Sequence, residues 1–83
     1  MKVTVKYFAS IREAIGTGSE QLETSATTLA GLRDELLALG GGHAESLARD
    51  KSVRLALNQT MSDESAALTD GAEVAFFPPV TGG

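Results

Sequence analysis

The chain has 83 residues, a formal net charge of −4 and no cysteine, so it is long enough for one domain with a small core and short for a deep catalytic pocket. The negative charge argues against nucleic acid and membranes as partners, because both recruit clustered lysine and arginine, and the lack of cysteine excludes disulfides and thiolate sites. The sequence contains neither an N-terminal signal nor an apolar run that could span a membrane, so we expect a cytoplasmic protein.

Hydrophobic periodicity predicts an order of elements that mixes strands and helices. Period-two alternation of β-branched and aromatic residues indicates the strands, and leucines at helical spacing indicate the main helix. Expected strands cover 2–8, 19–24, 53–58, 60–61 and 73–77. Expected helices cover 10–15 and a longer stretch that starts at Thr27 or Thr28 and ends at 39, and 43–50 is irregular or a single helical turn. A mixed sheet of four to five strands packed on one main helix is a two-layer α+β domain. We therefore expect a folded domain at 1–77 and an extended tail at 78–83.

Local signals refine these elements and argue against a conventional active site. A capping box at 10–13 predicts that Ser10 caps the first helix. The glycines at 40–42 are expected to end the main helix rather than cradle a phosphate, because no strand precedes them and no Gly-Lys-Ser/Thr follows. His43 has no metal-ligand spacing and is expected to be a solvated loop residue, with no metal site. The acidic residues are scattered, and charged residues 33–35 fall mostly on the outer side of their helix, which indicates a solvated face.

Two aromatic residues depart from the polar pattern of the outer strand faces. Phe8 shares its face with lysines, and Phe77 follows the inward Phe76. If the first and last strands are parallel neighbours, Phe8 and Phe77 come together at the root of the tail, where Met61 joins them. An exposed apolar cluster of this kind is typical of a partner surface. The alternatives are that a loop covers these residues or that the assumed alternation of inward and outward side chains is wrong.

The last strand stops at two prolines, which lack the N–H that a central strand requires. The tail that follows consists of Pro78, Pro79, Val80, Thr81, Gly82 and Gly83. Fully extended, it spans roughly 20 Å, enough to enter a pocket on another protein. Glycine has no Cβ to obstruct a narrow channel, and the prolines lower the entropy lost on insertion. The candidate reactive group is therefore the Gly83 carboxylate, which ATP can convert to an acyl-adenylate; the alternative is an inert, frayed terminus.

The ending Phe-Phe-Pro-Pro-Val-Thr-Gly-Gly at 76–83, preceded by Asp70-Gly71, resembles the C-terminus of the MoaD-type small subunit of molybdopterin synthase. Asn58-Gln59 and the opening at 5–13 also resemble that family, so the resemblance covers essentially the whole chain. It implies a β-grasp, ubiquitin-like fold. It also implies a non-catalytic carrier subunit of a sulfurtransferase, with the catalytic side chains on the large subunit.

The resemblance implies a role for the tail and for four docking residues. An E1-like adenylating enzyme would use ATP to activate Gly83, and a sulfur donor protein would convert it to a thiocarboxylate. The tail would then insert into the large subunit of a two-plus-two heterotetramer and donate sulfur to cyclic pyranopterin monophosphate, with no permanently bound cofactor. By position, the docking residues are Phe8, Arg12, Met61 and Phe77, although an aliphatic residue is common where Met61 stands.

Other functions remain open at this point. A thiamine-pathway sulfur carrier and a ubiquitin-like protein modifier share the terminal Gly-Gly, and a plain interaction domain would have an inert tail. The Phe-Phe-Pro-Pro run at 76–79 favours the molybdenum pathway, because the other carriers usually lack it.

Overall fold

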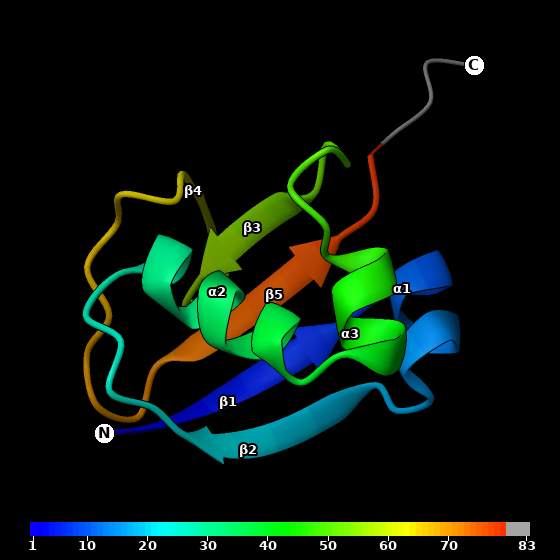
Figure 1. Ribbon diagram of the computed structural model, residues 1–83. Coiled ribbons are helices and arrows are strands. Elements are labelled where there is room, and N and C mark those ends of the chain that lie inside the picture. The colour runs from blue at the N-terminus through cyan, green and yellow to red at the C-terminus, as the bar shows by residue number, and fades with distance from the viewer. Residues whose placement is uncertain (80–83) are drawn as a thin grey trace.

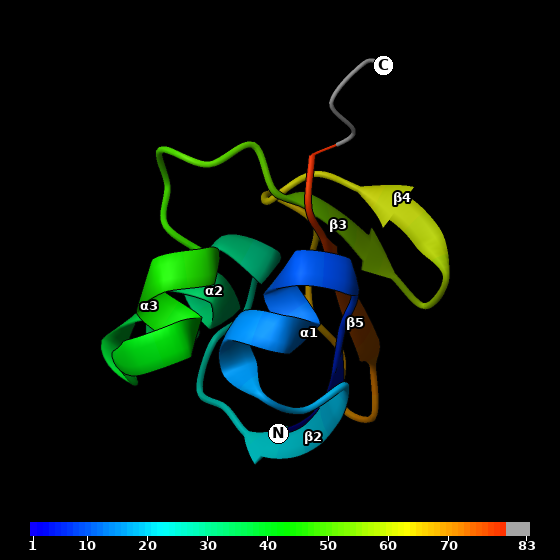
Figure 2. The same ribbon diagram turned by 90° about the vertical axis from the view of Figure 1, so that its right-hand side faces the viewer.

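Residues 1–79, which the computed structural model describes, form a mixed five-stranded sheet with helices packed on one face (Figures 1 and 2). The elements are β1 (Lys2–Tyr7), α1 (Ala9–Ile15), β2 (Ser19–Glu23), α2 (Leu29–Ala38), α3 (Gly41–Ser46), β3 (Arg54–Leu57), β4 (Thr60–Ser62) and β5 (Glu73–Phe77). The strand order is β2-β1-β5-β3-β4. β1 and β5 run parallel, and the other neighbouring pairs are antiparallel. The expected α+β class is confirmed.

The first and last strands lie side by side near the centre of the sheet (Figure 1). Their pairing ends with Tyr7 opposite Phe76. A turn fixes the start of β5 to the start of β1, because Gly71 N donates to Lys2 O at 2.7 Å and Lys2 N donates to Asp70 Oδ1 at 2.8 Å. Gly71 has a φ of +80°, which only glycine adopts readily. The two strands therefore start together and finish together.

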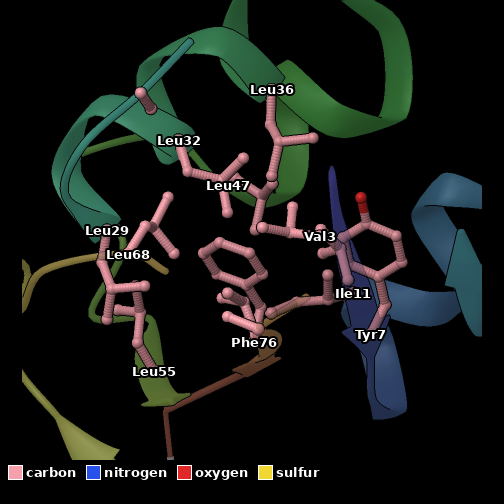
Figure 3. Close-up of a cluster of buried hydrophobic side chains, with 14 residues drawn as sticks. Val3, Tyr7, Ile11, Leu29, Leu32, Leu36, Leu47, Leu55, Leu68 and Phe76 are labelled. Carbon is pink, nitrogen blue, oxygen red and sulfur yellow. The ribbon is translucent and has the colours of Figure 1, made fainter. Parts of the chain in front are cut away.

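The core lies between the inner face of the sheet and α2. Val3, Val5 and Tyr7, which the sequence places on the buried face, are each at most 1% exposed. They pack around Phe76 with the leucine stripe of the main helix (Figure 3). That stripe consists of Leu29, Leu32 and Leu36. Burying one such side chain contributes about 1.5–3 kcal/mol, and a one-residue slip would turn the strand's apolar set outward, so this core sets the strand register.

The main helix begins and ends as the sequence predicts. Thr28 is its N-cap, and its Oγ1 accepts a hydrogen bond from Gly31 N at 3.2 Å. Gly40, just beyond the C-cap Leu39, has a φ of +73°. No helix within residues 1–79 combines the length and the apolar character needed to cross a membrane.

One local expectation is wrong, and another is incomplete. The first helix begins at Ala9 with Phe8 as its N-cap, and no side chain caps it, so Ser10 lies inside the helix. The chain turns directly from the strand into this helix, and Phe8 O accepts from Ile11 N at 3.1 Å. The glycine triplet also does more than end a helix, because Gly41 is the first residue of a further helix, α3.

The outward position expected for Arg33 is wrong as well. Its side chain is buried, at 3% exposure, where the periodicity of α2 placed it on the solvent side. Arg33 Nε donates to Leu47 O at 2.8 Å, a second nitrogen donates to Ala48 O at 2.8 Å, and Nη1 lies 3.5 Å from Glu64. These acceptors and the carboxylate compensate for the desolvation of the charge. Arg33 thus attaches the loop after α3 to the main helix.

Candidate functional site

The aromatic pair expected at the root of the tail is present. Because β1 and β5 are parallel and in register, the residues that follow their last pair come together. The rings of Phe8 and Phe77 stack with centroids 4.6 Å apart and planes 10° from parallel. Phe8 is 40% exposed. The outward-facing pair is therefore covered by no loop of residues 1–79, and Pro78 follows directly from it.

Met61 lies on the same face of the sheet, at its edge. It pairs with Ala56 of β3, which in turn pairs with Ala75 of β5. Directly paired residues share a face, and Ala75 and Phe77 are two positions apart on β5, so Met61 and Phe77 face the same side. Met61 is 56% exposed. The face with Phe8, Met61 and Phe77 is called the outer sheet face below.

Charged side chains border this apolar surface. Arg54 is exposed and stands opposite Phe77 in the β3–β5 ladder. Lys6 forms an ion pair with Glu73 across the β1–β5 ladder, with Lys6 Nζ 3.5 Å from Glu73 Oε1. Exposed pairs of this kind add little stability. Their effect is to place a polar rim around an apolar centre, which is the usual anatomy of a protein interface.

Arg12 comes from a different element. It lies on α1 and is exposed, and a Cβ built at Gly18 would come within 3.2 Å of Arg12 Nε. The arginine side chain thus covers a glycine in the loop that follows its own helix. The structure brings Phe8 and Phe77 together on the outer sheet face. Arg12 lies on α1, which packs with α3 on the helix side of the sheet.

The tail begins within the described residues and continues beyond them. Pro78 is half-buried and Pro79 is exposed, and neither continues the strand. Val80, Thr81, Gly82 and Gly83, to which the sequence assigns tail insertion and the reactive carboxylate, lie outside the described residues. Among residues 1–79, no group of three or more His, Cys, Asp or Glu side chains is arranged to hold a metal ion.

A polar cluster that the sequence did not reveal lies on the helix side of the sheet. His43 was expected to be solvated, but it belongs to the short helix α3 and is half-buried, and its Nε2 lies 2.8 Å from Glu20 Oε2. Tyr7 OH donates to the same carboxylate oxygen at 2.6 Å. Because a carboxylate only accepts, Nε2 carries the proton of the histidine bond. These residues are far apart in sequence, and only their joint packing on β1, β2 and α3 shows the contact.

The shared carboxylate is perturbed by its two donors. Burial raises the pKa of the Glu20 carboxyl, but the hydrogen bonds from His43 and Tyr7 favour the ionised form, so the pKa is lowered overall. Burial, together with the hydrogen bond to Glu20, raises the pKa of the Tyr7 hydroxyl. The cluster therefore joins α3 to the sheet through a carboxylate that stays charged near neutral pH.

This cluster predicts a specific loss of stability in acid. A carboxyl whose pKa is lower in the folded state stabilises the fold above its unfolded pKa, near 4.3, and loses that contribution as the pH falls through the folded pKa. We expect Glu20→Gln to lower the free energy of unfolding at neutral pH and to lower it progressively less at acidic pH. Urea unfolding of both proteins across this pH range measures the difference. A difference that does not change with pH would contradict the assignment to Glu20.

Comparison with known proteins defines the family. The model of the ThiS family matches residues 5–83. The chain belongs to the ThiS family. Among relatives, it is 41% identical over 81 residues to the molybdopterin synthase sulfur carrier subunit of Escherichia coli, covering 98% of this chain and 99% of the relative. The ThiS-family match and this relative confirm the resemblance to the MoaD-type subunit. A second relative, from Haemophilus influenzae, is also a molybdopterin synthase sulfur carrier subunit, so the relatives do not favour a role in the thiamine pathway.

Two solved structures support the fold of this ThiS-family chain. The protein-protein complex of subunits 1 and 2 of molybdopterin-converting factor from Helicobacter pylori contains a chain that is 28% identical, with a TM-score of 0.70 and full coverage of both chains. SAMP1 from Haloferax volcanii is 23% identical, with a TM-score of 0.80 and full coverage of both, and shows the fold alone. The expected β-grasp, ubiquitin-like fold is confirmed.

Proposed function

We propose that this chain is the sulfur-carrier small subunit of a molybdopterin synthase and that its C-terminal carboxylate carries the sulfur. The observation that carries the proposal is the placement of the Phe8–Phe77 pair at the root of the tail, in a chain 41% identical to a sulfur carrier subunit of that enzyme. A partner that binds the outer sheet face meets the tail where it leaves the sheet. Gly83 is then within roughly 20 Å of the aromatic pair, the reach of a six-residue extended segment.

The proposed chemistry takes place on the main chain. A carboxylate oxygen of Gly83 attacks the α-phosphorus of ATP on an E1-like adenylating enzyme, and pyrophosphate leaves. The terminal sulfur of a donor protein's persulfide attacks the carbonyl carbon, and AMP leaves. A second thiol on the partner then attacks the acyl disulfide, which releases the thiocarboxylate and leaves a disulfide on the partner. In the large subunit that sulfur passes to cyclic pyranopterin monophosphate during molybdenum cofactor biosynthesis. The chain itself needs no permanent cofactor, because ATP is a substrate of the activating enzyme.

In this proposal the side chains of the small subunit bind and position, and the catalytic side chains belong to the partners. Phe8 and Phe77 form the apolar centre of the docking surface, Met61 extends it to the edge of the sheet, and Arg12 is proposed to contact the partner from α1. The prolines hold the start of the tail in an extended direction. We also propose that two copies of each subunit form the heterotetramer and that the protein acts in the cytoplasm.

Intact-mass measurement tests the proposed function. The chain is incubated with ATP, a cognate adenylating enzyme and a sulfur donor, and the expected product has one oxygen replaced by sulfur at Gly83. Addition of the large subunit and the pterin precursor should return the carboxylate and form a dithiolene product. No mass change with any adenylating enzyme would exclude a sulfur carrier. Covalent attachment to protein amines, without sulfur exchange, would indicate a ubiquitin-like modifier instead.

The outer sheet face predicts a binding hot spot at Phe77. Phe77→Ala should raise the Kd for the large subunit by about 30-fold, equivalent to roughly 2 kcal/mol, because it removes one of the two stacked rings at the centre of the surface. Isothermal titration calorimetry measures the Kd. The matched control is Gln21→Ala, since Gln21 is exposed on the same face but on the edge strand β2, opposite Thr4. Equal affinities for the two variants would remove Phe77 from the interface.

A further inference from the structure

A small cavity adjoins the tail root on the helix side of the sheet, opposite the outer sheet face. Its volume is about 240 Å³. Apolar side chains from three segments line most of it, namely α1, the segment before β3 and the start of the tail. These residues are Ile11, Ala14, Val53, Pro78 and Pro79. The two prolines thus separate an aromatic surface on one side from a hollow on the other.

The walls of this cavity are firmly placed. α1 and α3 approach closely, because the Cα of Gly42 packs against the main chain at Ala14 and Ile15. Ser46, which also lines the cavity, donates its hydroxyl to Gly42 O at 2.6 Å, so this polar group is satisfied within its own helix. Ile11 is 2% exposed and belongs to the core. The hollow is a fixed feature of the packing of α1 on α3.

Size and chemistry indicate what the cavity accepts. Sites for cofactors and drug-sized ligands usually measure about 300–1,000 Å³, so a cavity of about 240 Å³ fits one large side chain better than a pterin or a nucleotide. Its rim carries one acidic and one basic residue, Glu45 and Lys51, and so favours neither sign of charge. The cavity is therefore suited to an uncharged, apolar anchor.

We propose that this cavity receives an apolar side chain of the molybdopterin synthase large subunit, an inference that rests on the proposed function above. The cavity is continuous with the root of the tail. Pro78 and Pro79 line the cavity and are also the first residues of the segment that the large subunit takes up. A protein that surrounds this segment must cover both sides of its root, and it meets Phe8 and Phe77 on one side and the cavity on the other. A side chain buried in such a pocket is the typical anchor of an interface.

Filling the cavity tests this proposal. Ala14 lies at its mouth on the exposed surface of α1, so Ala14→Trp occupies the space without replacing a core residue. The matched control is Glu13→Trp, which puts the same side chain on the neighbouring exposed position outside the cavity. We expect Ala14→Trp to weaken binding of the large subunit at least about tenfold and Glu13→Trp to leave it nearly unchanged. Calorimetry gives the affinities, and circular dichroism with urea unfolding verifies the fold.

The outcomes separate this inference from the function on which it rests. If Ala14→Trp binds the large subunit like the wild type, the cavity is no anchor site. If it impairs only adenylation, the cavity serves the activating enzyme, and the proposal is equally overturned. Should the tryptophan variant fail to fold, Ala14→Leu provides the same test with a smaller filler. Failure of the wild-type chain to acquire sulfur at Gly83 would instead contradict the proposed function itself.

Discussion

A short peptide added after Gly83 should abolish sulfur acceptance and leave the free energy of unfolding unchanged. The added residues displace the terminal carboxylate by about 3.3 Å each and put a Cβ where glycine has none. A channel that admits the terminal glycines therefore cannot present the new carboxylate to ATP. Stability should not change, because within residues 1–79 the last strand, β5, ends at Phe77 and is followed by the half-buried Pro78, and the added peptide starts only after five further residues.

Intact-mass measurement after incubation with the adenylating enzyme, ATP and sulfur donor checks this result. The control is the same peptide placed before Met1. The Met1 amine bonds to Thr24 O at 2.9 Å, at the opposite end of β1 from Phe8 (Figure 1). That fusion should accept sulfur normally. Normal sulfur acceptance by the C-terminally extended chain would show that the reactive group is not the carboxylate of Gly83.

The C-terminally extended chain and the Phe77→Ala variant together separate the carrier function from docking. The extended chain retains Phe8, Met61 and Phe77, so it should still bind the large subunit through the outer sheet face. Calorimetry should therefore show binding without sulfur transfer. The Phe77→Ala variant should show the opposite pattern: it should form the thiocarboxylate normally but bind the large subunit weakly.

Features that depend on one strand and its direct neighbours could be predicted from the sequence. Alternation identified the buried face of β1, and Val3 and Val5 are buried as expected. The alternation of inward and outward side chains placed Phe8 and Phe77 on the outer face, and the parallel pairing of β1 with β5 brings them together. Both inferences use the period of two, which one register fixes for a whole strand.

Features that depend on contacts between distant segments could not be predicted. The acceptors for Arg33 are main-chain oxygens of Leu47 and Ala48, and main-chain groups leave no signature in the sequence. The contact between His43 and Glu20 joins residues 23 positions apart. A polar side chain seen in isolation looks solvated, because its partner is supplied by the tertiary fold.

The glycine triplet shows the same limit at one position. Glycines after a helix indicate a C-cap, and Gly40 fulfils that role with its positive φ. Gly42 is different, because it lies within α3 and permits the close approach of α1. Sequence alone does not distinguish a glycine needed for its φ from a glycine needed for its lack of a side chain.

Gly42→Ala should therefore destabilise the protein by about 3 kcal/mol, the upper part of the usual range for overpacking. A Cβ at this position would overlap the carbonyl oxygen of Ala14 and lie 3.0 Å from Ile15 Cα. Both atoms belong to the main chain of α1, so neither can rotate away as a flexible side chain does. Helix propensity works in the opposite direction, since alanine is favoured over glycine by about 1 kcal/mol, but the overlap outweighs it.

Gly41→Ala is the matched control for this prediction. Its φ is +55° and a Cβ there meets nothing within 4 Å, so the cost should be only that of a left-handed alanine, about 1–2 kcal/mol. Urea unfolding measures both variants, and equal losses would show that α1 and α3 do not need the close contact. To relieve the overlap, α1 must move away from α3. Both helices wall the cavity beside Pro78 and Pro79, so this movement changes the shape of the cavity. Gly42→Ala should thus weaken binding of the large subunit even under conditions where it is fully folded, whereas Gly41→Ala should not.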